Sequence, residues 1–149
     1  MLVNADRKPM KINELRGKPT VLAFFPGAFT GVCTKEMCTF RDEMAAFSAL
    51  NAQVIGISVD SPFAQKAFAE QNNLNFQNFQ FLSDYNREAV RAFDVQDPNF
   101  VGGMLPGVAM RSVFVLDKNG VVRFKWVAPT QTTEPDYKAV EAAVKALSR

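Results

Sequence analysis

The chain alternates between short runs of apolar residues and longer stretches in which apolar residues recur every three or four positions. Residues 20–25 and 53–59 are mostly apolar, which is typical of strands buried on both faces of a sheet. In residues 31–50 the apolar positions follow helical spacing, which predicts one long helix. Further elements are predicted as helices at residues 61–72, 87–93 and 133–147, a short strand at 79–82, a loop at 97–108 and a β-hairpin at 111–127. This order predicts an α/β fold in which a mixed sheet carries helices on both faces.

Length and composition indicate one compact domain, residues 1–149, that is long enough to bury a full core. Hydrophobic residues make up 48% and charged residues 21%, which favours a globule over a disordered chain. The net charge is +2 and no basic run exceeds two residues, so nothing favours binding to nucleic acid or to an anionic membrane. Because no apolar segment of signal-peptide length and no run of 18 apolar residues occurs, we expect a soluble cytoplasmic protein.

The cysteine and histidine content limits the kinds of metal site and catalytic reaction that this chain can support. Two cysteines cannot form a disulfide framework, and the absence of histidine removes most zinc sites and the usual general base at neutral pH. Any base-dependent reaction must therefore use a group that its surroundings have already ionised. A cysteine that ionises without a histidine meets this condition, whereas a Ser-His or Cys-His hydrolase does not.

A cysteine stands in the first turn of the helix predicted at residues 31–50, directly after a buried strand and a short loop. If Thr30 is the N-cap of this helix, Cys33 is its third residue. Free backbone N–H groups and the positive end of the helix dipole then favour the thiolate, which is the nucleophilic form. The alternative is a buried and unreactive cysteine, which is the more common fate of a lone cysteine.

The pattern P-x-x-x-T-x-x-C formed by Pro26, Thr30 and Cys33 resembles the active-site motif of the peroxiredoxins, which are thiol peroxidases with a thioredoxin-like fold. The resemblance covers most of the chain and includes residues 13–19, 54–60, 81–84 and 111–120. It implies that Cys33 attacks the peroxide, that the Thr30 hydroxyl contacts both thiolate and peroxide, and that Pro26 shields the thiolate from water. It also implies that no metal, haem or flavin cofactor is needed.

Arg111 and Glu36 are the charged residues that the resemblance adds to this site. By itself Arg111, at the start of an apolar strand, is either a solvated strand end or a cation aimed at the site. The resemblance implies the second role, in which the arginine stabilises the thiolate and holds the peroxide oxygens with its planar fork. Glu36 lies one turn after Cys33, where a carboxylate alone would oppose the thiolate. We interpret it as the residue that orients the arginine, and the alternative is a solvated helix face.

The second cysteine, Cys38, follows Cys33 by five residues. On an ideal helix their Cα atoms are about 8.7 Å apart, whereas a disulfide needs less than about 7 Å. The two thiols therefore cannot bond while the helix is intact. The C-x-x-x-x-C spacing resembles the bacterioferritin-comigratory-protein type of peroxiredoxin, which implies that the helix unwinds and Cys38 resolves oxidised Cys33. The loop before Arg111 is more similar to the single-cysteine and atypical types, and the alternative is that Cys38 is a core residue.

The function that the resemblance implies is a thiol-dependent peroxidase, which reduces hydrogen peroxide and alkyl hydroperoxides and is recycled by a thioredoxin-like dithiol protein. The alternatives are a single-cysteine peroxidase resolved by an external thiol and a non-catalytic redox sensor or holdase. A thioredoxin-type oxidoreductase is disfavoured because the chain has no C-x-x-C. The apolar segment at residues 100–106 is either the surface of a homodimer or a cover over the core.

Overall fold

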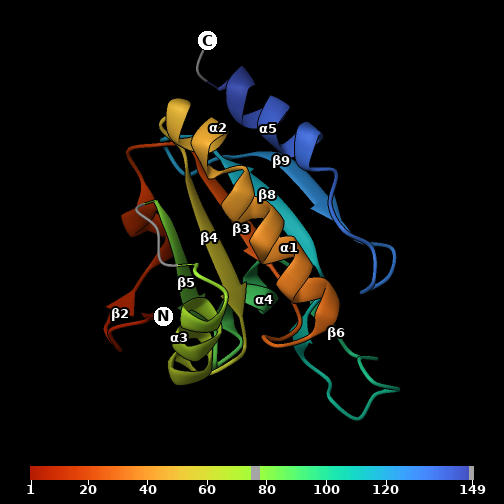
Figure 1. Ribbon diagram of the computed structural model, residues 1–149. Coiled ribbons are helices and arrows are strands. Elements are labelled where there is room, and N and C mark those ends of the chain that lie inside the picture. Colours follow the sequence, from red (N-terminus) through yellow and green to blue (C-terminus); the bar gives the residue numbers. More distant parts are fainter. Residues whose placement is uncertain (75–77, 148–149) are drawn as a thin grey trace.

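The computed structural model describes residues 1–74 and 78–147 and builds them around one seven-stranded sheet (Figure 1). In spatial order its strands are β2 (Pro9–Met10), β1 (Leu2–Asn4), β5 (Phe79–Ser83), β4 (Gln53–Ser58), β3 (Thr20–Phe24), β8 (Ser112–Leu116) and β9 (Val122–Val127). Strands β3, β4 and β5 are parallel to one another, and the other pairs of neighbours are antiparallel. The predicted mixed sheet is therefore confirmed.

Helices cover both faces of the sheet, as predicted. One face carries α1 (Gly31–Asp42), α2 (Met44–Ala49), α3 (Pro62–Gln71) and α5 (Tyr137–Ala146), which lie in front of the sheet in Figure 1. The other face carries α4 (Glu88–Ala92) and a 3₁₀ helix, η1 (Ile12–Leu15). Within the residues that the structure describes, no helix is both long and apolar enough to cross a membrane.

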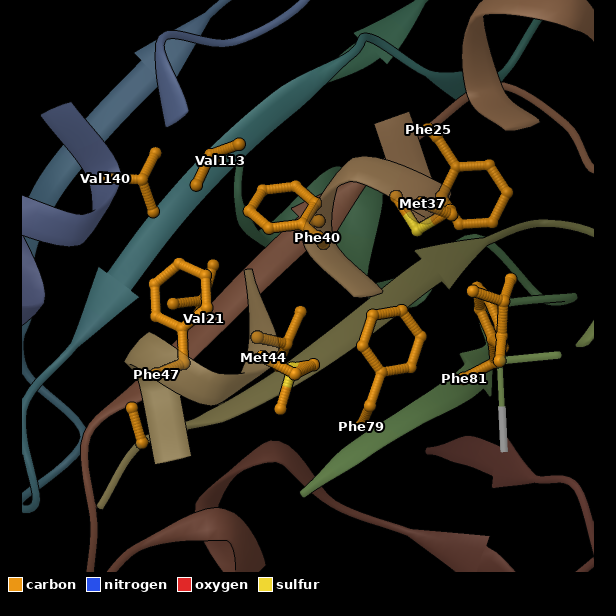
Figure 2. Packing of buried hydrophobic residues seen from close by; sticks show 14 of the residues in the cluster. Val21, Phe25, Met37, Phe40, Met44, Phe47, Phe79, Phe81, Val113 and Val140 are labelled. Atoms are coloured by element: carbon orange, nitrogen blue, oxygen red, sulfur yellow. The ribbon is translucent and has the colours of Figure 1, made fainter. Parts of the chain in front are cut away.

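The central strands β3, β4 and β8 are buried along their whole length, so successive side chains enter two separate cores. In β3, Val21 and Ala23 face the layer of α1, α2 and α5, whereas Leu22 and Phe24 face the opposite layer. Figure 2 shows the first of these cores, where side chains from the helices pack onto the strands. The continuous apolar runs in the sequence thus correspond to strands that are buried on both faces, which gives the loop after β3 a firmly packed base.

The helix predicted at residues 31–50 is wrong as a single element, because the chain turns at Glu43 and forms two helices. Glu43 ends α1 and precedes α2, with φ −89° and ψ 0°. Its backbone N–H still bonds to α1, and its carbonyl oxygen accepts from the first turn of α2. The apolar face continues through the turn with helical spacing and stays buried, at Met37, Phe40, Met44 and Phe47.

Two further boundaries differ from the prediction. The last helix begins at Tyr137 and not at residue 133, because Asp136 is its N-cap and accepts the backbone N–H groups of Lys138 and Ala139 at 3.1 Å each. The loop predicted at residues 97–108 is closed at its base by a small antiparallel sheet of β6 (Gln96–Asp97) and β7 (Val108–Ala109). This small sheet lies next to the start of β8 in the chain and so borders the candidate site.

The two outer strands of the main sheet differ from the inner ones. β2 is two residues long and contains Pro9. β9 has six residues, and the side chains of Arg123 and Lys125 on it are exposed. Between them, Phe124 and Trp126 pack against the core below α5, so only one face of β9 is buried.

Candidate active site

The loop that follows β3 carries the predicted motif into the start of α1. Pro26 is buried, and Thr30 occupies the N-cap position of α1 with an extended backbone. Cys33 is therefore the third residue of the helix, as predicted. The Thr30 hydroxyl makes no capping hydrogen bond and donates instead to the Gly27 carbonyl oxygen at 3.0 Å. Thr30 is thus the N-cap by position and not by hydrogen bonding.

Asp60 holds the same loop from the neighbouring strand, and sequence reasoning missed it. Its Oδ2 accepts the backbone N–H of Ala28 and the hydroxyl of Ser58, each at 2.7 Å. Asp60 follows β4, which is parallel to β3, so the two loops leave the sheet at the same edge. A polar residue directly after a buried parallel strand is the signal that could have identified it.

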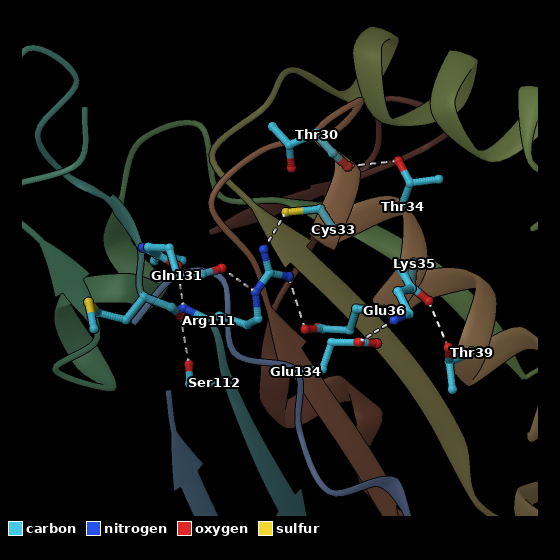
Figure 3. Close-up of polar contacts among 12 residues, drawn as sticks. Thr30, Cys33, Thr34, Lys35, Glu36, Thr39, Arg111, Ser112, Gln131 and Glu134 are labelled. Carbon is cyan, nitrogen blue, oxygen red and sulfur yellow. Dashed lines mark hydrogen bonds and ion pairs between the residues drawn. The ribbon is translucent and has the colours of Figure 1, made fainter. Parts of the chain in front are cut away.

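Arg111 places its guanidinium between Cys33 and Glu36 (Figure 3). Its Nη2 donates to Cys33 Sγ at 3.0 Å, and its Nη1 donates to Glu36 Oε2 at 3.0 Å. The antiparallel register of β3 and β8 brings the residue before β8 next to the residues after β3. Cys33 and Glu36 are 0% exposed and Arg111 is 1% exposed. The solvated alternatives for Arg111 and Glu36 are therefore wrong, and the cation lies in contact with the sulfur.

Burial changes how the charged groups of this cluster titrate. Burial raises the pKa of Glu36 to about 7, although the Arg111 guanidinium opposes the rise. Burial acts to lower the pKa of Arg111, but the negative charges of Glu36 and Cys33 outweigh it and the pKa of Arg111 is raised. Within the part of the chain that the structure describes, Glu36 Oε1 has no hydrogen-bond partner. Near neutral pH the carboxyl group of Glu36 is therefore partly protonated, while Arg111 keeps its charge.

A further group of polar residues lies around Glu36, centred on Glu134. Glu134 accepts from the Tyr137 hydroxyl at 2.7 Å and pairs with Lys35 Nζ at 3.0 Å. Burial acts to raise the pKa of Glu134, but these two contacts hold it below its ordinary value. Burial, and then the hydrogen bond to Glu134, raise the pKa of Tyr137. Glu134 therefore stays ionised, and its charge adds to the effects that keep a proton on Glu36.

Two more hydrogen bonds hold Arg111 from the segment between β9 and α5. The Gln131 carbonyl oxygen accepts from Arg111 Nε, and Gln131 Oε1 accepts from the Arg111 backbone N–H, each at 2.9 Å. The sequence carries no signal for this residue, because it lies in an irregular segment twenty positions after Arg111.

Cys38 lies on the same helix as Cys33 and is half-buried. Both cysteines are free thiols, and α1 is helical from Gly31 to Asp42. A separation of five residues on an unbroken helix puts the two Cα atoms beyond the reach of a disulfide. A bond between Cys33 and Cys38 therefore requires the helix to open.

An open hollow of about 550 Å³ lies against the motif loop. Pro26 and Thr30 line one side of it, and residues 100–106 supply apolar side chains. Met104 is 75% exposed and Leu105 is 53% exposed, so this segment does not cover the core, which removes one of its two predicted roles. Another hollow, of about 600 Å³, lies at the opposite end of the strands and has no cysteine in its lining.

Comparison with known proteins finds one matching family model and many similar sequences. The family model described as the AhpC/TSA family matches residues 1–125. The chloroplastic peroxiredoxin Q of Sedum lineare is 39% identical over 122 residues, which are 82% of this chain and 61% of that protein. The chloroplastic peroxiredoxin Q of Gentiana triflora is 41% identical over 122 residues, which are 82% of this chain and 52% of that protein. The chain thus spans little more than half the length of these relatives.

Solved structures share the fold. A peroxiredoxin-like protein from Aquifex aeolicus matches with a TM-score of 0.85 at 32% identity, over 98% of this chain and 81% of that one. The bacterioferritin comigratory protein of Xanthomonas campestris matches with a TM-score of 0.82 at 25% identity, over 99% of this chain and 91% of that one. These matches confirm the predicted thioredoxin-like fold. Since the family match runs from β1 through the Cys33 loop and past Arg111, the chain belongs to the AhpC/TSA family, in which its named relatives are peroxiredoxins.

Proposed function

We propose that this protein is a thiol-dependent peroxidase that reduces hydrogen peroxide and alkyl hydroperoxides at Cys33. The observation that carries the proposal is the 3.0 Å contact between Arg111 Nη2 and Cys33 Sγ in a buried site. A guanidinium at this distance stabilises a thiolate, and the N-terminus of α1 adds to the effect. Reduction of alkyl peroxides is an activity of the Xanthomonas campestris bacterioferritin comigratory protein, which supports the choice of substrates.

The first step oxidises Cys33 by two electrons. Its thiolate attacks the distal oxygen of the hydroperoxide, the O–O bond breaks, and the remaining oxygen leaves with the bonding electrons and takes up a proton as water or an alcohol. Arg111 and backbone N–H groups near Cys33 stabilise the negative charge as it moves onto the oxygens, and the Thr30 hydroxyl joins them once it turns away from the Gly27 carbonyl oxygen. Pro26, buried after β3, keeps water from the sulfur. Cys33 is left as a sulfenic acid.

Access to the sulfur requires a local movement. Cys33 is fully covered, so a peroxide reaches it only when the motif loop or the first turn of α1 opens. Thr30 and Gly31 are exposed at this end of the helix, and Thr30 borders the open hollow. Helix ends open at a lower free energy than the packed middle, which makes this turn the part that moves first.

In the second step the Cys38 thiol attacks the sulfenic acid of Cys33, the disulfide forms and water leaves. This step needs the first turns of α1 to unwind, while Arg41 anchors the other end of the helix by donating from Nη1 to the Asn72 carbonyl oxygen at 2.7 Å. A thioredoxin-like dithiol protein then reduces the disulfide by thiol–disulfide exchange and becomes oxidised itself.

Treatment of the reduced protein with one equivalent of hydrogen peroxide, followed by alkylation and digestion with trypsin, tests both steps. Cleavage after Lys35 places the two cysteines on different peptides. A disulfide between Cys33 and Cys38 therefore joins two peptides that otherwise separate. A stable sulfenic acid instead adds one oxygen to the Cys33 peptide and leaves Cys38 open to alkylation.

Two variants test the proposed roles of Cys33 and Cys38. Cys33→Ser is expected to abolish peroxide consumption, and robust turnover by this variant would exclude the peroxidase. Cys38→Ser is expected to keep the first peroxide reduction and to lose turnover with a thioredoxin-type reductant. Unchanged turnover of Cys38→Ser would instead indicate a single-cysteine enzyme resolved by an external thiol. Slow oxidation of the wild-type protein without turnover would favour a redox sensor.

We also propose a cytoplasmic location and a homodimer that forms through residues 100–106. The exposed apolar side chains of Met104 and Leu105 support the dimer. Since the relatives include chloroplastic proteins, cell fractionation is needed to test the location, and light scattering tests the dimer.

A further inference from the structure

Gln131 makes two hydrogen bonds to Arg111 and two more to the small sheet of β6 and β7, which closes the base of the loop at residues 97–108. Its carbonyl oxygen accepts from Arg111 Nε, as Figure 3 shows, and its Oε1 accepts from the Arg111 backbone N–H. Its Nε2 donates to Asp97 Oδ2 at 2.8 Å and to the Ala109 carbonyl oxygen at 3.0 Å. One residue therefore connects the guanidinium of the arginine, its backbone and the small sheet of β6 and β7.

These contacts determine the direction of the guanidinium. Each of its three nitrogens has a different partner, because Nε meets Gln131, Nη1 meets Glu36 and Nη2 meets Cys33. Because the guanidinium is planar, holding the backbone and Nε limits the directions in which its two terminal nitrogens can point. Gln131 holds both of them, the backbone through its side chain and Nε through its carbonyl oxygen.

The side-chain amide of Gln131 has one orientation that satisfies every partner. Its oxygen meets a donor, the Arg111 N–H, and its nitrogen meets two acceptors, on Asp97 and Ala109. Asp97 is 8% exposed, and its second oxygen accepts the backbone N–H of Asn99 at 2.8 Å. A rotation of the amide by half a turn would set its oxygen against two acceptors and its nitrogen against a donor. The side-chain amide therefore links the small sheet to Arg111 in one fixed orientation.

We propose that Gln131 is a positioning residue for Arg111 and that the rate of peroxide reduction at Cys33 depends on the hydrogen bonds of its side chain. The proposal rests on the peroxidase function proposed above. Gln131 does not touch the sulfur, and its effect passes through the direction of Arg111 Nη2. Misplacing a catalytic group by about 1 Å costs up to about 100-fold in rate. Because the carbonyl contact to Nε survives a side-chain substitution, we expect a loss of about tenfold.

A comparison of two reagents separates this role from a merely structural one. Gln131→Met removes the side-chain hydrogen bonds at similar volume, and its Cys33 is reacted with hydrogen peroxide and, separately, with iodoacetamide. Both reagents need the thiolate and an open site, but only the peroxide needs a correctly aimed arginine. Both rates are read from the Cys33 tryptic peptide. The rate with hydrogen peroxide divided by the rate with iodoacetamide is expected to fall about tenfold. Gln96→Met, at an exposed glutamine of β6, is the matched control and should keep the wild-type ratio.

An unchanged ratio in Gln131→Met overturns the proposal, because a merely structural role slows both reactions by the same factor. Failure of the peroxidase function looks different, since Cys33 of the wild-type protein then does not react with peroxide at all.

Reversing the direction of the hydrogen bond between residues 131 and 97 tests whether the lost rate ratio can be restored. Gln131→Glu keeps an acceptor for the Arg111 N–H but sets a carboxylate against Asp97, so its ratio should fall as well. Adding Asp97→Asn supplies a donor in the opposite direction. The double variant is expected to recover part of the lost ratio, because the Ala109 carbonyl oxygen still lacks its donor. No recovery would contradict the proposed role of this hydrogen bond.

Discussion

Replacement of Glu36 by glutamine should remove a loss of stability that the wild-type protein suffers as the pH rises. Beside Arg111, burial raises the pKa of Glu36 from an ordinary 4.5 to about 7. A raised pKa means that the folded protein binds this proton more tightly than the unfolded chain does. The stabilising contribution of the protonated group is therefore complete below about pH 4.5 and is lost as the pH rises through about 7.

The size of this loss follows from the two pKa values. They differ by about 2.5, and each unit corresponds to about 1.36 kcal/mol, so the loss is about 3 kcal/mol. Solvent screening does not reduce it, because Glu36 is 0% exposed. Glutamine cannot ionise, but it keeps the size of the side chain and an oxygen that accepts from Arg111 Nη1. The free energy of unfolding of the wild type, measured relative to Glu36→Gln, should therefore fall by about 3 kcal/mol across this pH range.

Urea unfolding of both proteins under reducing conditions, at a series of pH values from about 4 to about 8, measures this difference. The charged and titratable neighbours Arg111, Lys35, Glu134 and Tyr137 are present in both proteins. Glu70→Gln removes an exposed carboxylate of α3 and shows what the loss of one surface charge does by itself. A difference that stays constant over the range, or that moves in favour of the wild type as the pH rises, would refute the raised pKa of Glu36.

Two further substitutions test the packing of the sheet and the start of the last helix by the same unfolding measurement. At Gly56 an added Cβ would lie 2.6 Å from two atoms of the Phe81 ring, so Gly56→Ala is expected to lower the free energy of unfolding by about 1–3 kcal/mol. An unchanged midpoint would mean that the ring moves aside without cost. Asp136→Ala removes both hydrogen bonds that cap α5 and should cost about 1 kcal/mol. A cost near zero would mean that water replaces the cap.

The places of the cysteine and the arginine in the fold were predictable from local patterns, whereas the role of Arg111 came from the resemblance to the peroxiredoxins, because by itself it could equally have been a solvated strand end. Cys33 follows a buried strand in the first turn of a helix, Glu36 lies one turn further, and Arg111 opens another buried strand. Because β3 and β8 are antiparallel neighbours, the start of one lies beside the end of the other. Cys33 and Arg111 therefore lie together at one edge of the sheet.

Other features could not be predicted, because they depend on contacts of the folded protein that leave no local pattern in the sequence. Apolar spacing continues through Glu43, so periodicity cannot reveal the turn there. The preference for threonine at an N-cap predicts a capping bond, but the fold of the loop turns the Thr30 hydroxyl toward Gly27. Gln131 lies in an irregular segment and meets Arg111 only in the folded protein. The role of Cys38 depends on an opened α1, which neither the sequence nor the closed helix displays.

The outer strands of the sheet bear on how the protein behaves when many copies are crowded together. An unpaired strand edge invites a strand from another chain to add to it, which starts aggregation. At one edge β2 is short and contains a proline, and at the other β9 exposes Arg123 and Lys125. Both devices discourage pairing between sheets. If the first turns of α1 unwind during the proposed reaction, these two edges keep the exposed sheet from joining that of another copy.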